Sequence, residues 1–349
     1  MTRHTRGMST RNAAVNDKFP LARQGFDWWM TVFSGWLLIG LYLDGWAHRH
    51  LRDLDTFFTP WHGVLYSGFF AAAGFLVVAL FRNRRRGDAW SRALPPGYGL
   101  SLVGVAIFIG GGVCDLIWHT VLGIEADLEA LLSPTHLTLA VGGVLVGSGP
   151  FRAEWRRLRP TSTPSLVQLA PMLLSMTFFL SVLTFFTQFA HPFVHLWPAG
   201  VPPEGQFFPQ ALGLVAILLQ TALLMGTLLL AVSRWTLPFG SLFLVLTLNS
   251  ALMSVLEAQY YLIAVGLLGG LAGDVLLKWL KPSVAYPTRV RLFACAVPMV
   301  LYGLYFVALA VTWGVWWSIP FWSGAIVLAG IVGWLLSVLM IPPRRPIEA

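Results

Sequence analysis

Two stretches of the sequence place a carboxylate and two histidines where they can meet. In the first, Asp44 and His48 are four residues apart at the end of an apolar run, a spacing that puts both side chains on one face of a helix. Thr59 and Pro60 then form a helix-start signal, so His62 falls in the first turn of the returning helix. We interpret Asp44, His48 and His62 as three ligands with an open position, a set that suits Cu(II), Zn(II) or Fe(II).

The second stretch repeats this pattern with a longer loop. Asp115 and His119 are again four residues apart, and Ser133, Pro134 and His136 repeat the hydroxyl, the proline and the histidine of the helix start. A carboxylate inside an apolar span is costly unless it is paired, so such residues are candidates for function. The alternatives are an Asp–His pair that only fixes helix packing, and a proton relay. Because the pattern occurs twice, we predict a second metal site at Asp115, His119 and His136.

Other polar residues lie near these stretches. Asp55, Glu125 and Glu129 are candidates for groups that orient the ligands or attract cations, with simple loop solvation as the alternative. For His191 and His195 we expect a solvated loop rather than a third ligand set. We also expect Glu257 to be water-exposed at a helix end, and Asp274 to pair with Lys278 one turn later.

The elements that must position these residues are membrane helices. The chain has 349 residues, of which 56% are hydrophobic and 11% charged, and its mean hydropathy is +0.70. This balance excludes an ordinary soluble domain and predicts an all-α, polytopic transmembrane bundle. Cys114 and Cys295 lie in apolar runs and indicate neither a disulfide framework nor a Cys-rich zinc module. About ten spans are expected, at roughly 28–48, 58–81, 100–122, 132–150, 167–190, 208–233, 240–257, 260–280, 291–316 and 319–341.

The charges divide between the two faces of this predicted bundle. All of the 23 lysines and arginines except Arg49 and Arg52 fall on one side, which the positive-inside rule makes cytoplasmic, together with both termini. All of the eight histidines except His4 fall on the opposite side. We therefore predict a multi-pass protein of the plasma membrane whose metal sites lie at the extracytoplasmic end. The basic residues lie in short loops, and no nucleic-acid partner is predicted.

Three regions follow from this reading. Residues 1–27 form a basic cytoplasmic tail, and residues 28–160 form a four-helix transmembrane half built from two repeated helical hairpins that carry the metal sites. Residues 161–349 form a six-helix transmembrane half of unknown role. Duplicated hairpins are familiar in membrane proteins and often place sites at the repeat interface.

The two stretches resemble the C subunit of the copper membrane monooxygenases, which oxidise methane, ammonia or short alkanes. The resemblance covers about residues 28–150. That subunit differs from this chain in having Asn at the position of Asp115 and in having shorter loops. It also works together with partner subunits. The likeness rests on Asp44-Gly45-x-x-His48, Arg52-Asp53, Phe58-Thr59-Pro60-x-His62, Trp118-His119-Thr120, Glu125 and Pro134-x-His136.

This resemblance implies copper bound by Asp44, His48 and His62 and by Asp115, His119 and His136, with zinc or iron as alternatives. It also implies oxidation of a small apolar substrate or ammonia with O2, in the lipid bilayer, with other monooxygenase-type subunits or a homo-oligomer as partners. A second hypothesis is a divalent-metal transporter or metal-delivery protein, and a third is a scaffold in which the Asp/His pairs only fix packing. A transporter requires polar residues below the sites, whereas the first four spans are mostly Gly, Ala, Ser, Leu and Val there.

Overall fold

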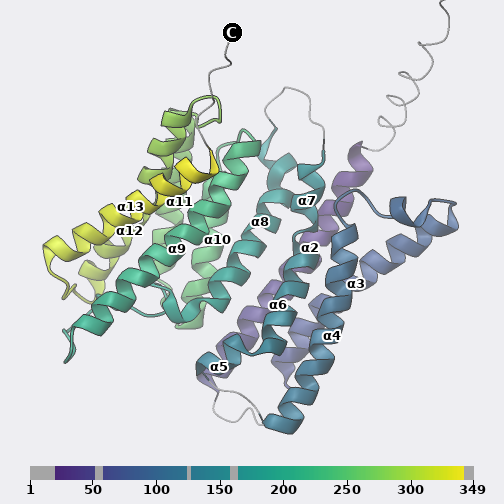
Figure 1. The fold of residues 1–349 in the computed structure, drawn as a ribbon, viewed down its shortest axis with the longest axis horizontal. Coiled ribbons are helices and arrows are strands. Elements are labelled where there is room, and N and C mark those ends of the chain that lie inside the picture. Colours follow the sequence, from purple (N-terminus) through teal and green to yellow (C-terminus); the bar gives the residue numbers. More distant parts are fainter. Residues whose placement is uncertain (1–19, 52–57, 124–126, 158–163, 342–349) are drawn as a thin grey trace, which may run out of the picture.

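The computed structural model describes residues 20–51, 58–123, 127–157 and 164–341 of the chain. Within these residues the fold is all-α (Figure 1). Eight of the helices are long and apolar enough to cross a membrane, so the chain is a multi-pass membrane protein. The helices are α2 (Pro20–His50), α3 (Pro60–Arg85), α4 (Gly99–Leu122), α5 (Asp127–Leu132), α6 (Pro134–Gly147), α7 (Gly149–Trp155), α8 (Leu166–Phe186), α9 (Phe207–Arg234), α10 (Ser241–Leu256), α11 (Leu262–Leu280), α12 (Pro287–Thr312) and α13 (Ile319–Met340), with 3-10 turns η1 (Trp90–Arg92) and η2 (Gln188–Ala190).

Each of the ten expected spans overlaps an apolar helix, but two of these helices are short. The fourth span corresponds to α6, which has 14 residues and is followed at Ser148 by α7. The seventh corresponds to α10, which has 16 residues. Hydropathy alone merged α6 with the start of α7, because the break between them is made by small residues rather than by charge.

The two hairpins match each other in their packing as well as in their ligands. A Cβ atom added to Gly68 of α3 would lie 2.6 Å from the backbone nitrogen of Leu37 in α2. In the second hairpin, a Cβ on Gly142 of α6 would lie 2.7 Å from the backbone nitrogen of Phe108 in α4. Leu37 and Phe108 each precede the aspartate of their hairpin by seven residues, and the two glycines each follow the second histidine by six. Close approach at equivalent glycines therefore fixes both hairpins in the same register.

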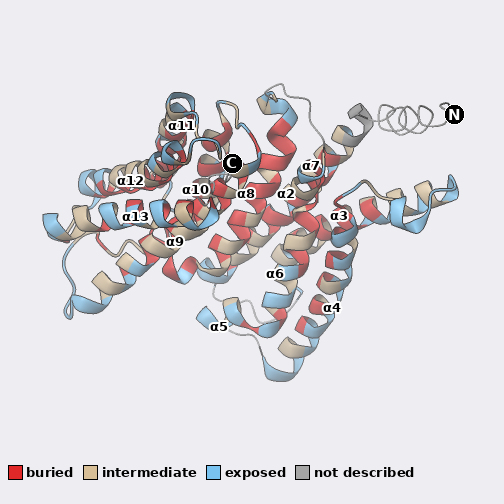
Figure 2. Cartoon of the chain, turned by 45° about the horizontal axis from the view of Figure 1, so that its top comes forward, coloured by how far each residue is buried: buried red, intermediate tan, exposed pale blue. Residues whose placement is uncertain are grey.

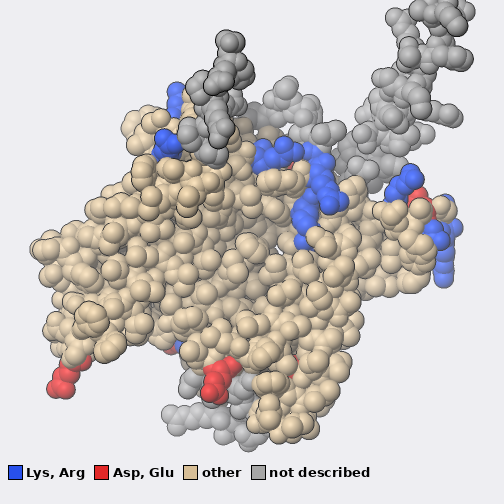
Figure 3. Space-filling view, viewed as in Figure 1, with Lys and Arg blue, Asp and Glu red and all other residues tan. Residues whose placement is uncertain are grey.

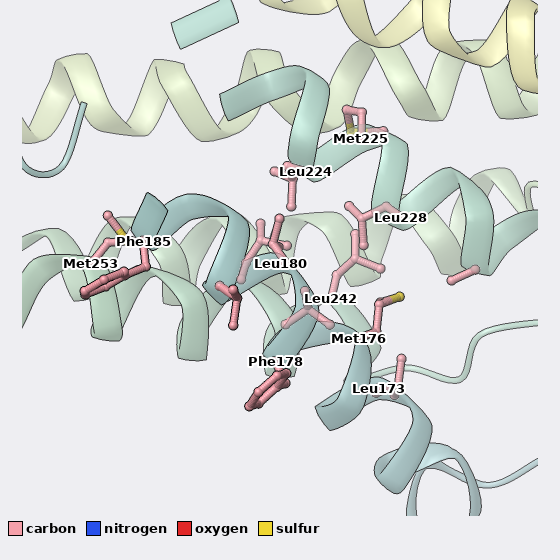
Figure 4. Packing of buried hydrophobic residues seen from close by; sticks show 14 of the residues in the cluster. Leu173, Met176, Phe178, Leu180, Phe185, Leu224, Met225, Leu228, Leu242 and Met253 are labelled. Carbon is pink, nitrogen blue, oxygen red and sulfur yellow. The ribbon is translucent and has the colours of Figure 1, made fainter. Parts of the chain in front are cut away.

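Helix α8 joins the two halves of the molecule. It lies between α2 to α7 and α9 to α13 (Figure 1), and its span is the most buried of the eight. Figure 4 shows its apolar side chains, such as Met176 and Leu180, packed with residues of α9 and α10 such as Leu228 and Met253. The Tyr42 hydroxyl of α2 donates to the Ser181 carbonyl of α8 at 2.9 Å. The hairpin half is thus tied directly to the C-terminal half.

The four-residue spacing of Asp274 and Lys278 predicted an ion pair, but Asp274 does not pair with Lys278. Its side chain is buried, and its two carboxylate oxygens accept the backbone N–H groups of Leu242 and Phe243, each at 3.0 Å. The first N–H groups of a helix have no partner within that helix. Asp274 of α11 therefore caps the N-terminus of α10, a role that its own local sequence does not reveal.

The outer surface of the bundle suits lipid. Large apolar side chains such as Phe70, Val121 and Val311 are exposed along the long helices (Figure 2). Contact with a lipid bilayer follows, because water would not favour such a surface. On the face drawn in Figure 3, lysines and arginines gather at the end of the molecule where α3, α7 and α11 lie, with a few acidic side chains among them, and further acidic side chains appear at the opposite end.

The glycine contacts make a testable prediction about the second hairpin. Alanine at Gly142 would push its Cβ into the backbone of α4, and overpacking of this kind costs roughly 1–3 kcal/mol. At the neighbouring Gly143, a Cβ would lie 3.7 Å from the nearest atom of Phe108, an ordinary contact. We expect Gly142→Ala to lower the thermal unfolding temperature of the purified protein, and the matched control Gly143→Ala to preserve or raise it. Equal unfolding temperatures for the two variants would contradict this packing.

Candidate metal centres

The first group of ligands comes from the end of α2 and the start of α3. Nε2 of His62 lies 3.4 Å from Oδ2 of Asp44, and Nε2 of His48 lies 3.8 Å from the same oxygen. Thr59 is the N-cap of α3, as expected: its hydroxyl accepts the backbone N–H of His62 at 3.1 Å, and Pro60 opens the helix. This cap fixes His62 in the first turn, where its ring turns back toward α2.

The second group has the same construction at the end of α4 and the start of α6. Nε2 of His136 lies 3.3 Å from Oδ1 of Asp115, and Nε2 of His119 lies 3.6 Å from it. Ser133 is the N-cap, and its hydroxyl accepts the backbone N–H of His136 at 3.3 Å. The structure therefore brings all six predicted ligands together as two separate triads.

The spacing of these atoms fits a shared ion as well as direct Asp–His pairing. In each triad, one ligand atom per residue lies within 4.8 Å of the others. Two ligands bound tetrahedrally at about 2.1 Å from an ion lie about 3.4 Å apart. The four carboxylate–imidazole distances, from 3.3 to 3.8 Å, lie close to this value. Each triad therefore brings one carboxylate oxygen and two imidazole nitrogens close enough to hold a metal ion.

In the second triad, backbone carbonyls select the imidazole tautomer. Nδ1 of His119 lies 3.3 Å from the carbonyl oxygen of Gly123, and Nδ1 of His136 is hydrogen-bonded to the carbonyl oxygen of Ala130. A carbonyl can only accept, so both Nδ1 atoms carry the proton and donate. In the neutral rings this leaves Nε2 as the atom that can bind an ion beside Asp115, as in metal-bound histidines, whereas in protonated rings Nε2 donates to Asp115.

The first triad contains an unsatisfied acceptor. Oδ1 of Asp44 is buried and has no hydrogen-bond partner among the residues that the structure describes. Leaving a buried charged acceptor without a partner is expensive. A cation bound between Asp44, His48 and His62 would offset this cost, so the donor set and the orphaned oxygen both fit a metal ion.

Both triads open onto one cavity of about 680 Å³. Its inner wall is apolar and includes Leu65, Phe108 and Phe178, together with Val182 and Phe185. Such a volume and lining are typical of sites for small organic molecules. The two hairpins therefore do not hold two independent surface sites, but two sites that face one apolar chamber.

The polar rim of this chamber comes from both halves of the chain. Arg49 of α2 forms an ion pair with Glu257, which follows α10, and its Nε donates to Oε1 of Gln188 in η2 at 3.1 Å. His195 also lines the cavity. The expectation that Glu257 and His195 are only solvated loop residues is thus incomplete. In the sequence, the only signal that these two residues could line a site was that both are polar and lie at the ends of predicted spans, on the histidine-rich side.

Tyr66 is a cavity residue that the sequence analysis missed. It follows His62 by one turn of α3, and the two ring centroids are 6.3 Å apart. A Cβ added to Gly112, which precedes Asp115 by three residues, would lie 3.2 Å from the Tyr66 hydroxyl oxygen. Tyr66 therefore reaches from the first hairpin to the second, and its spacing of four from His62 was the available signal.

The remaining candidates are Asp55, Glu125 and Glu129. Asp55 and Glu125 fall outside the described residues. Glu129 is exposed on α5, where the cavity wall is formed by Leu128, Ala130 and Leu131. Among the described residues, no group that was predicted to orient the ligands lies against a triad. Thr135 was not predicted, but its hydroxyl donates to Oδ1 of Asp115 at 2.7 Å.

His191 belongs to neither triad. It is buried, and its Nδ1 accepts the backbone N–H of Phe193 at 3.1 Å. Burial lowers the pKa of His191 to about 3, because a protonated ring would lose its hydration there. The expectation of a solvated histidine is therefore wrong: the ring is a neutral packing element that holds the segment leading to His195.

Comparison of the chain with protein-family models, with curated proteins and with solved structures gave no match. Assignment of a function therefore depends on the geometry of the two triads and their chamber.

The buried His191 predicts a pH dependence of stability. The unfolded chain binds a proton at this ring below its ordinary pKa of 6.5, whereas the folded protein does so only near 3. Stability from this ring is therefore complete above 6.5 and is lost as the pH falls, by up to roughly 1.4 kcal/mol per pH unit. We expect His191→Asn, which keeps an acceptor for Phe193, to show a smaller loss of unfolding free energy than wild type between pH 6.5 and 4. An identical slope in both proteins would mean that this ring is protonated when folded.

Proposed function

We propose that this chain is a copper-binding integral membrane protein related to the C subunit of the copper membrane monooxygenases. In this proposal the Asp44 and Asp115 triads each hold one ion at the extracytoplasmic end of the bundle, and both termini are cytoplasmic. The protein oxidises a small apolar molecule or ammonia with O2. The observation that carries the proposal is that both triads open onto one cavity whose inner wall is apolar.

The donor set supports a borderline transition metal. Each triad offers one carboxylate oxygen and two imidazole nitrogens, and thiolate or thioether sulfur does not line the cavity in the described chain. Such ligands suit Cu(II), Zn(II) and Fe(II) and leave positions open for an exogenous molecule. The resemblance of the motifs favours copper. An ion of this kind would supply activation of dioxygen at its open position.

The chain's own residues provide the surroundings for such chemistry. The carboxylates and imidazoles would hold and orient the ions, and the apolar inner wall would border the space in front of them. An apolar substrate can partition into this space from the lipid that surrounds the bundle. The volume of about 680 Å³ leaves room for a molecule considerably larger than methane or ammonia.

Transport is less well supported by the same cavity. Beyond the triads, the lining toward the opposite end is mostly apolar and includes Leu37, Leu38, Phe108, Gly143 and Phe178, beside the hydroxyl of Tyr66. A cation crossing this region would meet mainly hydrocarbon with few polar groups to replace its water, which is costly. A metal-delivery protein, which releases its ion on the side where it took it up, is compatible with the cavity but does not explain its apolar wall.

Metal analysis of the purified protein tests the proposal. We expect about two copper ions per wild-type chain, one for each triad, and about one in either His62→Ala or His136→Ala. His50→Ala is the matched control, because His50 is an exposed histidine at the end of α2 outside both triads. Failure of wild type to retain stoichiometric metal, or full retention in both triad variants, would remove the basis of the proposal.

A second measurement separates oxidation from transport. Copper-loaded protein in lipid nanodiscs, together with its partner subunits where these exist, should consume O2 when a small alkane or ammonia and a reductant are supplied. Proteoliposomes containing the same protein should show no metal uptake above that of His62→Ala/His136→Ala liposomes. Metal uptake that depends on the triads, without O2 consumption, would favour the transporter.

A further inference from the structure

The two triads have the same ligand types but different surroundings, beginning with their carboxylates. Oδ1 of Asp115, which both histidines face, also accepts the Thr135 hydroxyl at 2.7 Å. The position of Thr135 in the first hairpin is taken by Trp61, whose ring packs edge-on against Trp46. Oδ1 of Asp44 correspondingly has no hydrogen-bond partner in the described chain. The Asp115 carboxylate is therefore held by a hydrogen bond from Thr135 before an ion binds, whereas the Asp44 carboxylate has no such bond at Oδ1.

Exposure separates the aspartates and the first histidines of the two triads as well. The side chains of Asp115 and His119 are 2% and 8% exposed, whereas those of Asp44 and His48 are 14% and 33% exposed. The second histidines differ less and in the opposite sense, with His136 21% and His62 14% exposed. Solvent therefore reaches Asp44 and His48 more easily than Asp115 and His119.

Both differences act on metal affinity in the same direction. Ligands fixed by hydrogen bonds lose less freedom when they bind an ion, and removal of such supporting groups typically lowers metal affinity about 10–100-fold. At the carboxylate of the second triad this support comes from Thr135. Exclusion of water also strengthens the attraction between the cation and its carboxylate.

We propose that the Asp115 triad is a tight site that keeps its ion and that the Asp44 triad is a weaker site that exchanges its ion with the outside. Thr135 is the positioning residue that contributes to this difference. The proposal rests on metal binding at both triads, as in the proposed function, and assigns them different roles. The Asp44 triad takes up and releases cations at the rim, whereas the Asp115 triad holds a resident ion deeper in the chamber.

The affinities can be compared in variants that keep one triad each. His48→Ala/His62→Ala leaves the Asp115 triad, and His119→Ala/His136→Ala leaves the Asp44 triad. Full-length protein in nanodiscs would be titrated with Cu(II) against a chelator of known affinity, and the release rate measured after addition of excess chelator. We expect the variant with the Asp115 triad to bind Cu(II) at least about 10-fold more tightly and to release it more slowly.

Thr135 can be tested with a matched control on the same helix. Thr135→Val keeps the shape of the side chain but removes the donor to Asp115, and should weaken the tight site about 10-fold. Thr138→Val is the control, because the Thr138 hydroxyl donates to the Pro134 carbonyl and not to Asp115. Both variants can be made in the otherwise wild-type protein, where two-step titration reports each site, so the test does not depend on folding of the double variants.

The outcomes distinguish this inference from the proposed function. Equal affinities, a tighter Asp44 triad, or equal effects of Thr135→Val and Thr138→Val on the tight site would overturn the inference while leaving two metal sites in place. A wild-type protein that binds no Cu(II) at all would overturn both.

Discussion

A carboxylate placed among apolar helices needs a positive partner, and this constraint governs the design of the hairpin half. Asp44 and Asp115 stand at the ends of long hydrophobic helices, where an isolated charge loses most of its hydration. Each is faced by two imidazoles from its own hairpin, at distances that leave space for an ion between them. The proline and hydroxyl that open α3 and α6, and the close helix contact at Gly68 and Gly142, all serve to bring these groups to one point.

Two hairpins of the same construction give one chain two such points. The equivalent glycines, caps and ligands show that the hairpins share one plan down to individual contacts. The two hairpins differ around the ligands rather than in them. Thr135 stands where the first hairpin has Trp61, and the Thr135 hydroxyl donates to Asp115, whereas Oδ1 of Asp44 has no hydrogen-bond partner in the described chain. Changes at one position per repeat can thus give two like sites different properties without altering the ligand set.

Much of this half could be predicted from sequence because its determinants are local. A four-residue spacing, a Ser/Thr-Pro helix start and a run of about 20 apolar residues each act within a few turns of chain. The features that could not be predicted are contacts between distant segments. The bond from Asp274 to the start of α10, the burial of His191 and the reach of Tyr66 toward α4 each depend on helix packing that no local pattern specifies. Asp274 and Lys278 had the spacing of an ion pair, but unpaired N–H groups of another helix were the stronger demand on the carboxylate.

The same distinction changes the role of the C-terminal half. From the sequence alone, the role of its six expected spans is unknown. In the structure, α8 supplies Phe178, Val182 and Phe185 to the chamber wall, and the residues after α8 and α10 supply much of its rim. The hairpins alone would present their triads to lipid or water along this side. Enclosure lowers the local dielectric and strengthens every interaction between an ion and its ligands. The C-terminal half therefore contributes to the sites by limiting the access of water rather than by providing ligands. A partner that covered the hairpin half in its place would have to provide the same apolar wall opposite both triads.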